Sequence, residues 1–400
     1  MTDAKDKTSI VLAAPVRTPI GRFGGALASL TAADLGTSAG KACLDRARLD
    51  PEAIDQVIFG HARQAGGGPN SARQIAYRCA IPVERPAFTV NQACGSGLQA
   101  VFCAARAIQL GEARVVLAGG TESMSNTPYM LPRARWGYRL GHDEVVDGMY
   151  RDGFNDPLSQ LIMGETAEEL ASEAGIDRHA ADAYAVRSQH RCERAREAGR
   201  FQSEIAPVTV PSRHGDRVVE LDEHPRDGVT VESLAKLPTV FRDGGTVTPG
   251  NASGITDAAA ALIVASEEAA RELGLEIMAR LVDWQVVGVE PRIMGIGPVP
   301  ATQQLLERQG LSFDQIDLVE LNEAFASQAL ACLAELPFDQ EIVNPDGGAI
   351  ALGHPIGCTA ARILVTLLHG LHQRRARRGI ATLCVSGGLG IAALVEMEND

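Results

Sequence analysis

Several short segments of this chain occur twice in the same order, and this duplication constrains the fold more than any other feature. Three pairs of segments match: Leu49–Ile58 with Leu311–Glu320, Val90-Asn91 with Val343-Asn344, and Leu117–Gly120 with Val385–Gly388. The first pair aligns without a gap and shares the core Ile-Asp-x-Val. Each match is weak alone, but an ordered set predicts two similar halves.

The first half alternates strand-like and helix-like segments. We expect strands at Ser9–Ala14, Ile54–Gly60, Ala87–Val90 and Ala113–Ala118, and helices at Ala32–Ala47 and Ser96–Leu110. Alternating strands and helices predict an α/β sheet covered on both faces. A chain of 400 residues is also too long for one core, so two or three packed units are expected.

The region between the halves, from about Ser123 to Asn251, has a different composition. It is rich in charged residues, Pro and Gly, and it includes the helical stretch Ala167–Ala198. A purely structural excursion has the same composition, but long insertions in compact domains tend to be lids or binding elements. We therefore expect an insertion whose loops cover a site between the halves.

Charge and cysteine spacing exclude several classes of protein. A net charge of −13 argues against a nucleic-acid partner, which requires a basic face. No apolar stretch is long enough to span a bilayer, and the N-terminus does not resemble a signal peptide, so a cytoplasmic protein is expected. The eight cysteines include no CxxC pair, which argues against a zinc knuckle and favours free thiols.

Cys94 lies where an expected strand turns sharply into a helix. Free backbone N–H groups and the positive end of the helix favour a thiolate there. Gly95 and Gly97 leave room for a substrate or another backbone to approach closely. A buried, inert cysteine at a strand–helix junction fits the same local pattern, so this segment alone leaves both interpretations open.

His354 lies in a rigid turn between Gly353 and Pro355, before an expected helix at Ala360–Leu371. An imidazole there can deprotonate a thiol or bind a carbonyl oxygen. Taken alone, such a residue is more often a turn histidine with satisfied hydrogen bonds. A basic run after this helix, His372–Gly379, suits either phosphate groups or the solvated last turn of a helix stopped by Gly379, and we favour the second.

Two further candidates follow strands of the second half. Cys384 precedes a glycine-rich turn that has neither GK[ST] nor a full GxGxxG, so the turn is not a nucleotide loop. Asn322 follows the expected strand Ile316–Leu321, where an amide can orient a water or a carbonyl group, or simply cap a turn.

Taken together, these segments resemble the thiolases. NQACGSG (91–97), NEAFA (322–326), GGAIALGHPIG (347–357) and CVSGGLG (384–390) are similar to the four signature segments of that family. Other stretches that resemble family segments are Arg17–Gly25, Gly119–Met124, Gly250–Gly254 and Met294–Pro300. The resemblance implies an α/β thiolase fold of five α-β-α-β-α layers, made of two similar halves with an inserted loop domain. The expected divisions are 1–124 with 252–277, 125–251 for the loop domain that binds coenzyme A, and 278–400.

The resemblance also implies a role for each candidate. Cys94 is the acylated nucleophile, His354 its base, and Cys384 the acid–base thiol at the substrate α-carbon. Asn322 holds a water in one oxyanion hole with His354, and the backbone N–H groups of Cys94 and Ser386 form the other. The implied coenzyme A contacts are Met163, Ser253, Met294, Ala324 and Phe325. No metal and no cofactor is expected, since coenzyme A thioesters are the substrates.

The implied activity is that of an acetyl-CoA C-acetyltransferase of the biosynthetic, short-chain branch. Two acetyl-CoA molecules condense reversibly to acetoacetyl-CoA and free coenzyme A through acetyl-Cys94. The alternatives are a 3-ketoacyl-CoA thiolase that degrades longer or dicarboxylic acyl chains, a β-ketoacyl synthase, and a non-catalytic acyl-CoA-binding protein. A synthase usually has a histidine where Cys384 stands. The expected partners are acyl-CoA, free coenzyme A and further copies of the chain, as a dimer of dimers, with no nucleic acid and no membrane.

Some positions depart from the family pattern. Ser386 stands where glycine is common, and a positive φ there is strained for serine. Pro249 replaces the usual alanine beside the pantetheine arm, and Cys358 and Thr359 replace small residues of many biosynthetic members. These changes leave the chemistry standing and the acyl-chain preference open.

Overall fold

The computed structural model describes residues 8–213 and 215–398. Its largest element is a ten-stranded sheet. Nine strands follow one path, in the order β12 (Leu318–Leu321), β13 (Arg378–Val385), β14 (Leu389–Met397), β11 (Ile277–Gly288), β1 (Ile10–Arg17), β10 (Thr256–Ser266), β5 (Val115–Ser123), β3 (Gln56–Gly60) and β4 (Ala87–Val90). The short β2 (Gly21–Arg22) pairs with β10 off this path.

The sheet consists of two similar halves joined at one strand pair. Antiparallel pairing of β1 with β11, beginning at Val11 and Arg280, connects β12–β11 to β1–β4. In each half a single 3₁₀ turn, Pro51–Ala53 or Phe313–Gln315, precedes a strand that pairs in parallel with its neighbour. These turns lie in the duplicated segments, so the predicted duplication is confirmed. The pairing of β1 with β11, which joins the two half-sheets, was not predicted.

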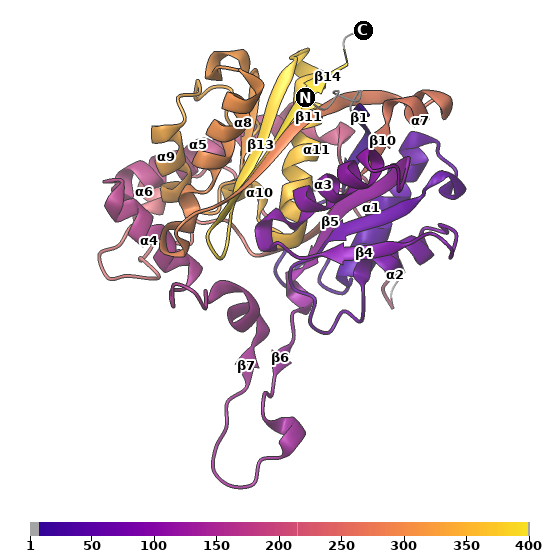
Figure 1. The fold of residues 1–400 in the computed structure, drawn as a ribbon. Coiled ribbons are helices and arrows are strands. Elements are labelled where there is room, and N and C mark those ends of the chain that lie inside the picture. Colours follow the sequence, from indigo (N-terminus) through magenta and orange to yellow (C-terminus); the bar gives the residue numbers. More distant parts are fainter. Residues whose placement is uncertain (1–7, 214, 399–400) are drawn as a thin grey trace, which may run out of the picture.

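Helices form three layers around the two half-sheets (Figure 1). In the central layer, α3 (Ser96–Gln109) packs against α11 (Ile356–Arg374), with β5 on one side and β13 on the other. On the outer faces, α1 (Ala32–Ala47) covers β10 and β5, and α8 (Pro298–Gln309) covers β14 and β11. Every residue of α11 from Ile356 to Leu371 is buried, as expected for a helix enclosed on all sides. The predicted five layers are confirmed.

The remaining helices are short or lie in the middle region. They are α2 (Ser71–Arg78), α4 (Met163–Glu173), α5 (Arg178–Glu197), α6 (Val231–Leu234), α7 (Glu267–Glu272), α9 (Ala326–Glu335) and α10 (Ala349–Leu352). The helical stretch predicted at Ala167–Ala198 is therefore two helices, separated where Gly175 adopts a φ of 64°. None of the helices in the described residues is long and apolar enough to cross a membrane.

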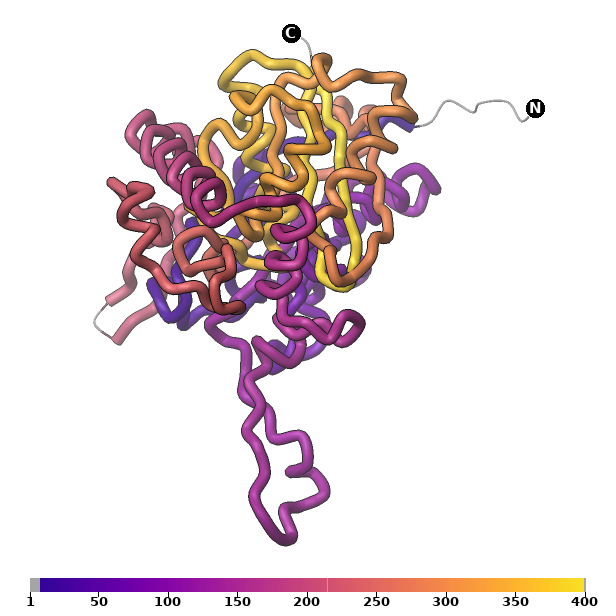
Figure 2. The backbone as a smooth tube through the Cα atoms, turned by 90° about the vertical axis from the view of Figure 1, so that its left-hand side faces the viewer, coloured from indigo at the N-terminus to yellow at the C-terminus, as the bar shows by residue number. Residues whose placement is uncertain are grey.

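Two hairpins also belong to the middle region. One is formed by β8 (Val208–Val210) and β9 (Arg217–Val219), and the other by β6 (Tyr129–Met130) and β7 (Val146–Asp147). The second carries residues 129–147 far from the rest of the molecule, and we call this segment the arm (Figure 1, Figure 2). After this region, β10 returns to the sheet between β1 and β5.

Several predicted boundaries are confirmed and others are wrong. Helix α1 spans the predicted residues, with Thr31 and Asp34 forming a capping box at its start. Helix α11 begins at Ile356, before the predicted Ala360, and ends at Arg374. Arg375 caps it in the left-handed conformation with a φ of 51°, while Gly379 lies inside β13. The glycine was therefore the wrong stop signal.

Candidate active site

Three of the four predicted catalytic residues, Cys94, His354 and Cys384, meet in one cavity between the halves. Its volume is about 210 Å³, and its lining includes Cys94, His354, Cys384 and Ser386. The same lining contains every predicted coenzyme A contact: Met163, Ser253, Met294, Ala324 and Phe325. Segments that are hundreds of residues apart in the sequence thus converge on one small volume, as the predicted site requires.

Cys94 lies in a 3₁₀ turn, Ala93–Gly95, that leads directly into α3. Ala93 adopts a φ of 43°, so this turn is tight even without glycine at that position. A Cβ atom at Gly97 would lie 2.4 Å from the backbone nitrogen of Ala361 in α11. The glycine therefore permits close packing of α3 on α11. Of the two possibilities that the sequence left open at Gly97, close approach of another backbone is confirmed, whereas the structure gives the glycine no contact role toward a substrate.

His354 contacts the Cys94 sulfur directly. Its Nε2 atom lies 3.3 Å from Cys94 Sγ, and its Nδ1 atom lies 2.6 Å from the Thr359 hydroxyl. That hydroxyl donates its one proton to the Pro355 carbonyl at 2.9 Å, so it accepts from Nδ1–H. The neutral imidazole is thus held in the tautomer that turns the Nε2 lone pair toward the thiol. This arrangement suits a general base acting on Cys94.

The surroundings favour the neutral form of both partners. Burial, followed by the charges of Arg362 and Arg63, lowers the pKa of His354 to about 3. Burial raises the pKa of the Cys94 thiol, while the charge of Arg63 and the backbone N–H groups of Ser386 and Cys94 offset part of that rise. Desolvation thus outweighs the local N–H groups that favour a thiolate at the helix start. A neutral Cys94 thiol would have to lose its proton before acting as a nucleophile, and His354 Nε2 lies 3.3 Å from its sulfur.

Cys384 lies near the end of β13 and is buried against Met294 and Ala324. Burial raises the pKa of its thiol well above the usual value, and the nearby Cys94 raises it further. Both thiols line the same cavity, and a negative charge on Cys94 opposes ionisation of Cys384.

The turn after Cys384 explains how serine is tolerated at position 386. Gly387 and Gly388 have φ values of 87° and 83°, whereas Ser386 is not among the residues with positive φ. The predicted strain at Ser386 is therefore wrong. The backbone N–H of Ser386 faces the Cys94 sulfur and lowers the pKa of that thiol. The left-handed backbone conformations are adopted by Gly387 and Gly388, and glycine adopts this conformation at the least energetic cost.

Asn322 is 1% exposed and follows β12 directly, but it is not among the residues that line the cavity. Its backbone N–H donates to the Thr382 carbonyl at 3.0 Å. Within the described part of the chain, neither Oδ1 nor Nδ2 of its side chain has a hydrogen-bond partner. Burying an unpaired amide costs about 1–3 kcal/mol, so this side chain is available to a small polar molecule.

Family models match almost the whole chain. The thiolase N-terminal domain matches residues 10–268, and the thiolase C-terminal domain matches residues 275–397. The chain belongs to the thiolase family.

Relatives of this thiolase are similar over their full length. An acetyl-CoA acetyltransferase of Cupriavidus necator is 47% identical, covering 98% of this chain and 100% of the relative. The crystal structure of the Bacillus anthracis acetyl-CoA acetyltransferase superposes with a TM-score of 0.96 at 45% identity, covering 98% of this chain and 99% of that one. Human mitochondrial 3-ketoacyl-CoA thiolase in complex with CoA superposes with a TM-score of 0.95 at 43% identity, and each chain is 98% covered.

A buried carboxylate behind the cavity of this thiolase was missed by the sequence analysis. Glu122, in β5, accepts hydrogen bonds from the backbone N–H groups of Arg63 at 3.1 Å and Gly357 at 2.8 Å. Its Oε1 atom lies 3.2 Å from His61 Nε2. Burial alone would raise the pKa of Glu122, but the hydrogen bond and charge of His61, with Arg63, hold it below the usual value. Glu122 thus ties the first half to the start of α11, close to His354.

Thr359 was also missed as a functional residue. It was read only as a departure in size, although it supplies the oxygen that orients His354. No helical spacing pointed to this contact, because the two residues are five positions apart and His354 precedes α11, which begins at Ile356.

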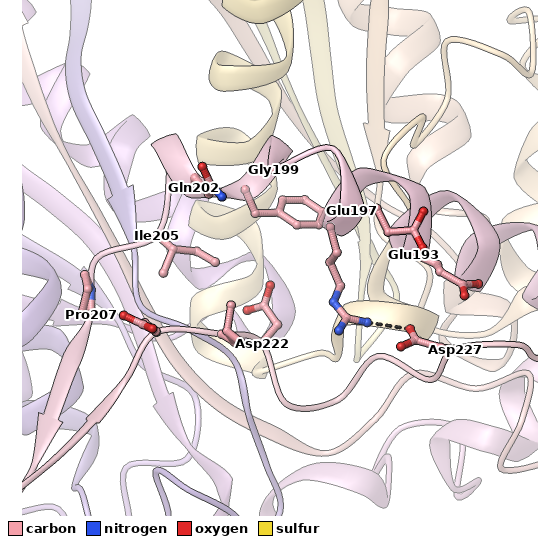
Figure 3. A pocket seen from close by; sticks show the side chains of 12 residues that line it. Glu193, Glu197, Gly199, Gln202, Ile205, Pro207, Asp222 and Asp227 are labelled. Atoms are coloured by element: carbon pink, nitrogen blue, oxygen red, sulfur yellow. Dashed lines mark hydrogen bonds and ion pairs between the residues drawn. The ribbon is translucent and has the colours of Figure 1, made fainter.

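A second cavity of about 600 Å³ lies away from these residues, between α5 and the segment that follows β9. Figure 3 shows carboxylates around it, among them Glu193, Glu197 and Asp222. Arg196 Nη1 donates to Asp227 Oδ1 at 2.7 Å. No predicted site residue lines it. Size therefore does not identify the active site of this thiolase.

Proposed function

We propose that this thiolase is an acetyl-CoA C-acetyltransferase that condenses two acetyl-CoA molecules to acetoacetyl-CoA and coenzyme A. The observation that carries the proposal is the contact of 3.3 Å between His354 Nε2 and Cys94 Sγ in the cavity that Cys384 also lines. The names of the similar bacterial enzymes support the same activity.

In the first half-reaction, Cys94 Sγ attacks the thioester carbon while His354 takes the thiol proton. The oxyanion accepts hydrogen bonds from the backbone N–H groups of Cys94 and Ser386. The carbon–sulfur bond of the thioester then breaks, and Cys384 donates its proton to the departing coenzyme A thiolate. The products are acetyl-Cys94, protonated His354 and ionised Cys384.

In the second half-reaction, the Cys384 thiolate removes a proton from the α-carbon of a second acetyl-CoA. His354 and Asn322, through a water, stabilise the enolate oxygen. The enolate carbon attacks the acetyl carbon on Cys94, and the Cys94 thiolate leaves and recovers its proton from His354. Protons and electrons balance without a cofactor. The reverse sequence is thiolysis, and degradation of longer or dicarboxylic acyl chains is its physiological alternative.

The remaining assignments are parts of the same proposal. We propose that five residues that line the cavity contact the pantetheine arm: Met163, Ser253, Met294, Ala324 and Phe325. All of them except Ser253 belong to the apolar cluster around Cys384. Residues 125–251 would then be the loop domain, with 1–124 plus 252–277 and 278–400 as the two halves. The cytoplasmic location stays a prediction from the sequence.

We propose that the chain assembles as a dimer of dimers. The arm supports this proposal, because it exposes large apolar side chains far from the core, including Trp136 at 83% and Leu140 at 96%. Exposed apolar clusters of this kind are usually covered by a partner. Multi-angle light scattering is expected to give the mass of four chains, and a monomer would contradict the assembly.

The proposed activity is tested by incubating the enzyme with acetyl-CoA and quenching in acid. Peptide mass mapping is expected to find one acetyl group, on Cys94, together with acetoacetyl-CoA in the supernatant. Acetyl groups mainly on Cys358 or Cys384 would contradict the assignment of the nucleophile.

A further inference from the structure

Arg63 introduces a positive charge into an otherwise apolar catalytic cavity. It follows β3 by three residues, is 7% exposed, and lines the cavity together with Cys94. Among the lining residues in the described structure it is the only Lys, Arg, Asp or Glu. A buried cation beside the nucleophile is costly unless it has a partner.

The hydrogen bonds of Arg63 within the described chain are incomplete. Its Nη1 atom donates to the Asp152 carbonyl at 3.0 Å, and its Nε atom is buried with no acceptor among the described residues. Glu122 accepts from the backbone N–H of Arg63, and no ion pair links the guanidinium to a carboxylate in that part of the protein. A guanidinium has five N–H donors and forms its best contacts with a planar carboxylate. Arg63 therefore has donors available for an anion in the cavity.

The position of Arg63 fixes which part of a substrate it meets. Cys384 packs with the apolar residues proposed to contact pantetheine, whereas Cys94 packs on a different cluster, formed by Ala62, Met124, Met149, Phe154 and Ile356. Arg63 follows Ala62 in this second cluster. Its Nη2 atom lies so close to Gly153 that a Cβ atom there would be 1.9 Å away, so glycine makes room for the guanidinium. An acyl chain on Cys94 that followed this wall would run away from the residues proposed to contact pantetheine and toward Arg63.

We propose that Arg63 binds a carboxylate at the far end of the acyl chain, so that the enzyme cleaves 3-oxoacyl-CoA thioesters derived from dicarboxylic acids. This inference rests on the thiolase chemistry proposed above and adds a substrate class to it. Cys94 attacks C3, the C2–C3 bond breaks, and C2 takes a proton from Cys384, releasing acetyl-CoA. The ω-carboxyacyl group on Cys94 then passes to coenzyme A, whose proton goes to Cys384, and His354 returns the original proton to Cys94.

The test compares two six-carbon substrates that differ only at the end of the chain. Thiolysis of 3-oxoadipyl-CoA and of 3-oxohexanoyl-CoA is measured as kcat/KM, with acetoacetyl-CoA as the reference. The wild-type enzyme is expected to prefer the dicarboxylic substrate. Arg63→Met is expected to lower that preference by roughly 10- to 100-fold, the range for losing a hydrogen bond to a charged group. Arg63→Lys keeps the positive charge but lacks the paired N–H donors of a guanidinium. It should give a substrate preference between those of the wild-type enzyme and Arg63→Met.

Arg151→Met is the matched control, because Arg151 lies in the same segment as Gly153 but is exposed and does not line the cavity. It is expected to keep the wild-type preference. Equal losses on both six-carbon substrates in Arg63→Met would assign Arg63 a structural role and overturn the proposal. A wild-type enzyme that does not prefer 3-oxoadipyl-CoA over 3-oxohexanoyl-CoA would also overturn the proposal. This comparison is decisive even if Arg63→Met fails to fold. Failure of the wild-type enzyme on acetoacetyl-CoA would instead contradict the underlying thiolase function.

Discussion

Thr359→Val tests whether the His354 tautomer is set by a single hydroxyl. Valine has nearly the shape of threonine but places a methyl group where the hydroxyl was, so the buried site keeps its volume and loses the hydrogen bonds of that oxygen. The Nδ1–H group of His354 is then left without its acceptor at 2.6 Å. An unpaired buried donor costs about 1–3 kcal/mol. If this cost falls on the transition state for acylation, the rate drops by about 5- to 150-fold.

The assay is single-turnover acetylation of Cys94, followed by acid quench and mass spectrometry. Thr359→Ser is the matched control, because it keeps the hydroxyl and is expected to acylate at nearly the wild-type rate. Thermal melting of all three proteins separates a loss of base orientation from a loss of folding. Normal acylation by Thr359→Val, or an equal loss in Thr359→Ser, would refute the proposed role of the hydroxyl.

Two further predictions follow from burial and close packing. Because the pKa of His354 is lowered to about 3, the base stays neutral above that pH and loses its proton-accepting form only as the pH falls toward 3. Stopped-flow acylation should therefore be flat from about pH 5 to pH 8, and a decline centred near pH 6.5 would contradict the assignment. Gly97→Ala should destabilise the fold by about 1–3 kcal/mol, because its Cβ atom would lie 2.4 Å from the Ala361 nitrogen. Gly288→Ala, with nothing within 4 Å of the added atom, is the control in urea unfolding.

The sequence predicted the parts of the site that are carried by contiguous segments. Cys94 and His354 each lie in a turn, and Cys384 lies in a strand just before a glycine-rich turn. These local patterns are visible in the sequence, and the duplication predicted two halves that bring them together. The structure adds that their protonation differs from the local expectation. Helix starts favour a thiolate, but burial between two half-sheets has the larger effect on Cys94.

Other features depend on contacts between distant segments, which local patterns do not contain. Glu122 joins the segment after β3 to the start of α11, and its role depends on burial that no spacing reveals. The pairing of β1 with β11 depends on how the two halves dock. At the end of α11, Arg375 adopts the left-handed conformation that Gly379 was expected to provide, because β13 has already begun at Arg378.

The central claim is that two thiols divide the reaction, and Cys384→Ala tests it most directly. Transfer of an acetyl group between Cys94 and coenzyme A needs no α-proton, whereas condensation needs a base at the α-carbon. Both half-reactions are measured on one folded preparation: acetyl exchange with labelled coenzyme A, and exchange of acetyl methyl protons with deuterium from the solvent. We predict that Cys384→Ala still forms acetyl-Cys94 and returns the acetyl group, but loses acetoacetyl-CoA formation and methyl-proton exchange. Parallel losses in transfer and condensation would show that Cys384 is only a core residue and would contradict the two-thiol mechanism.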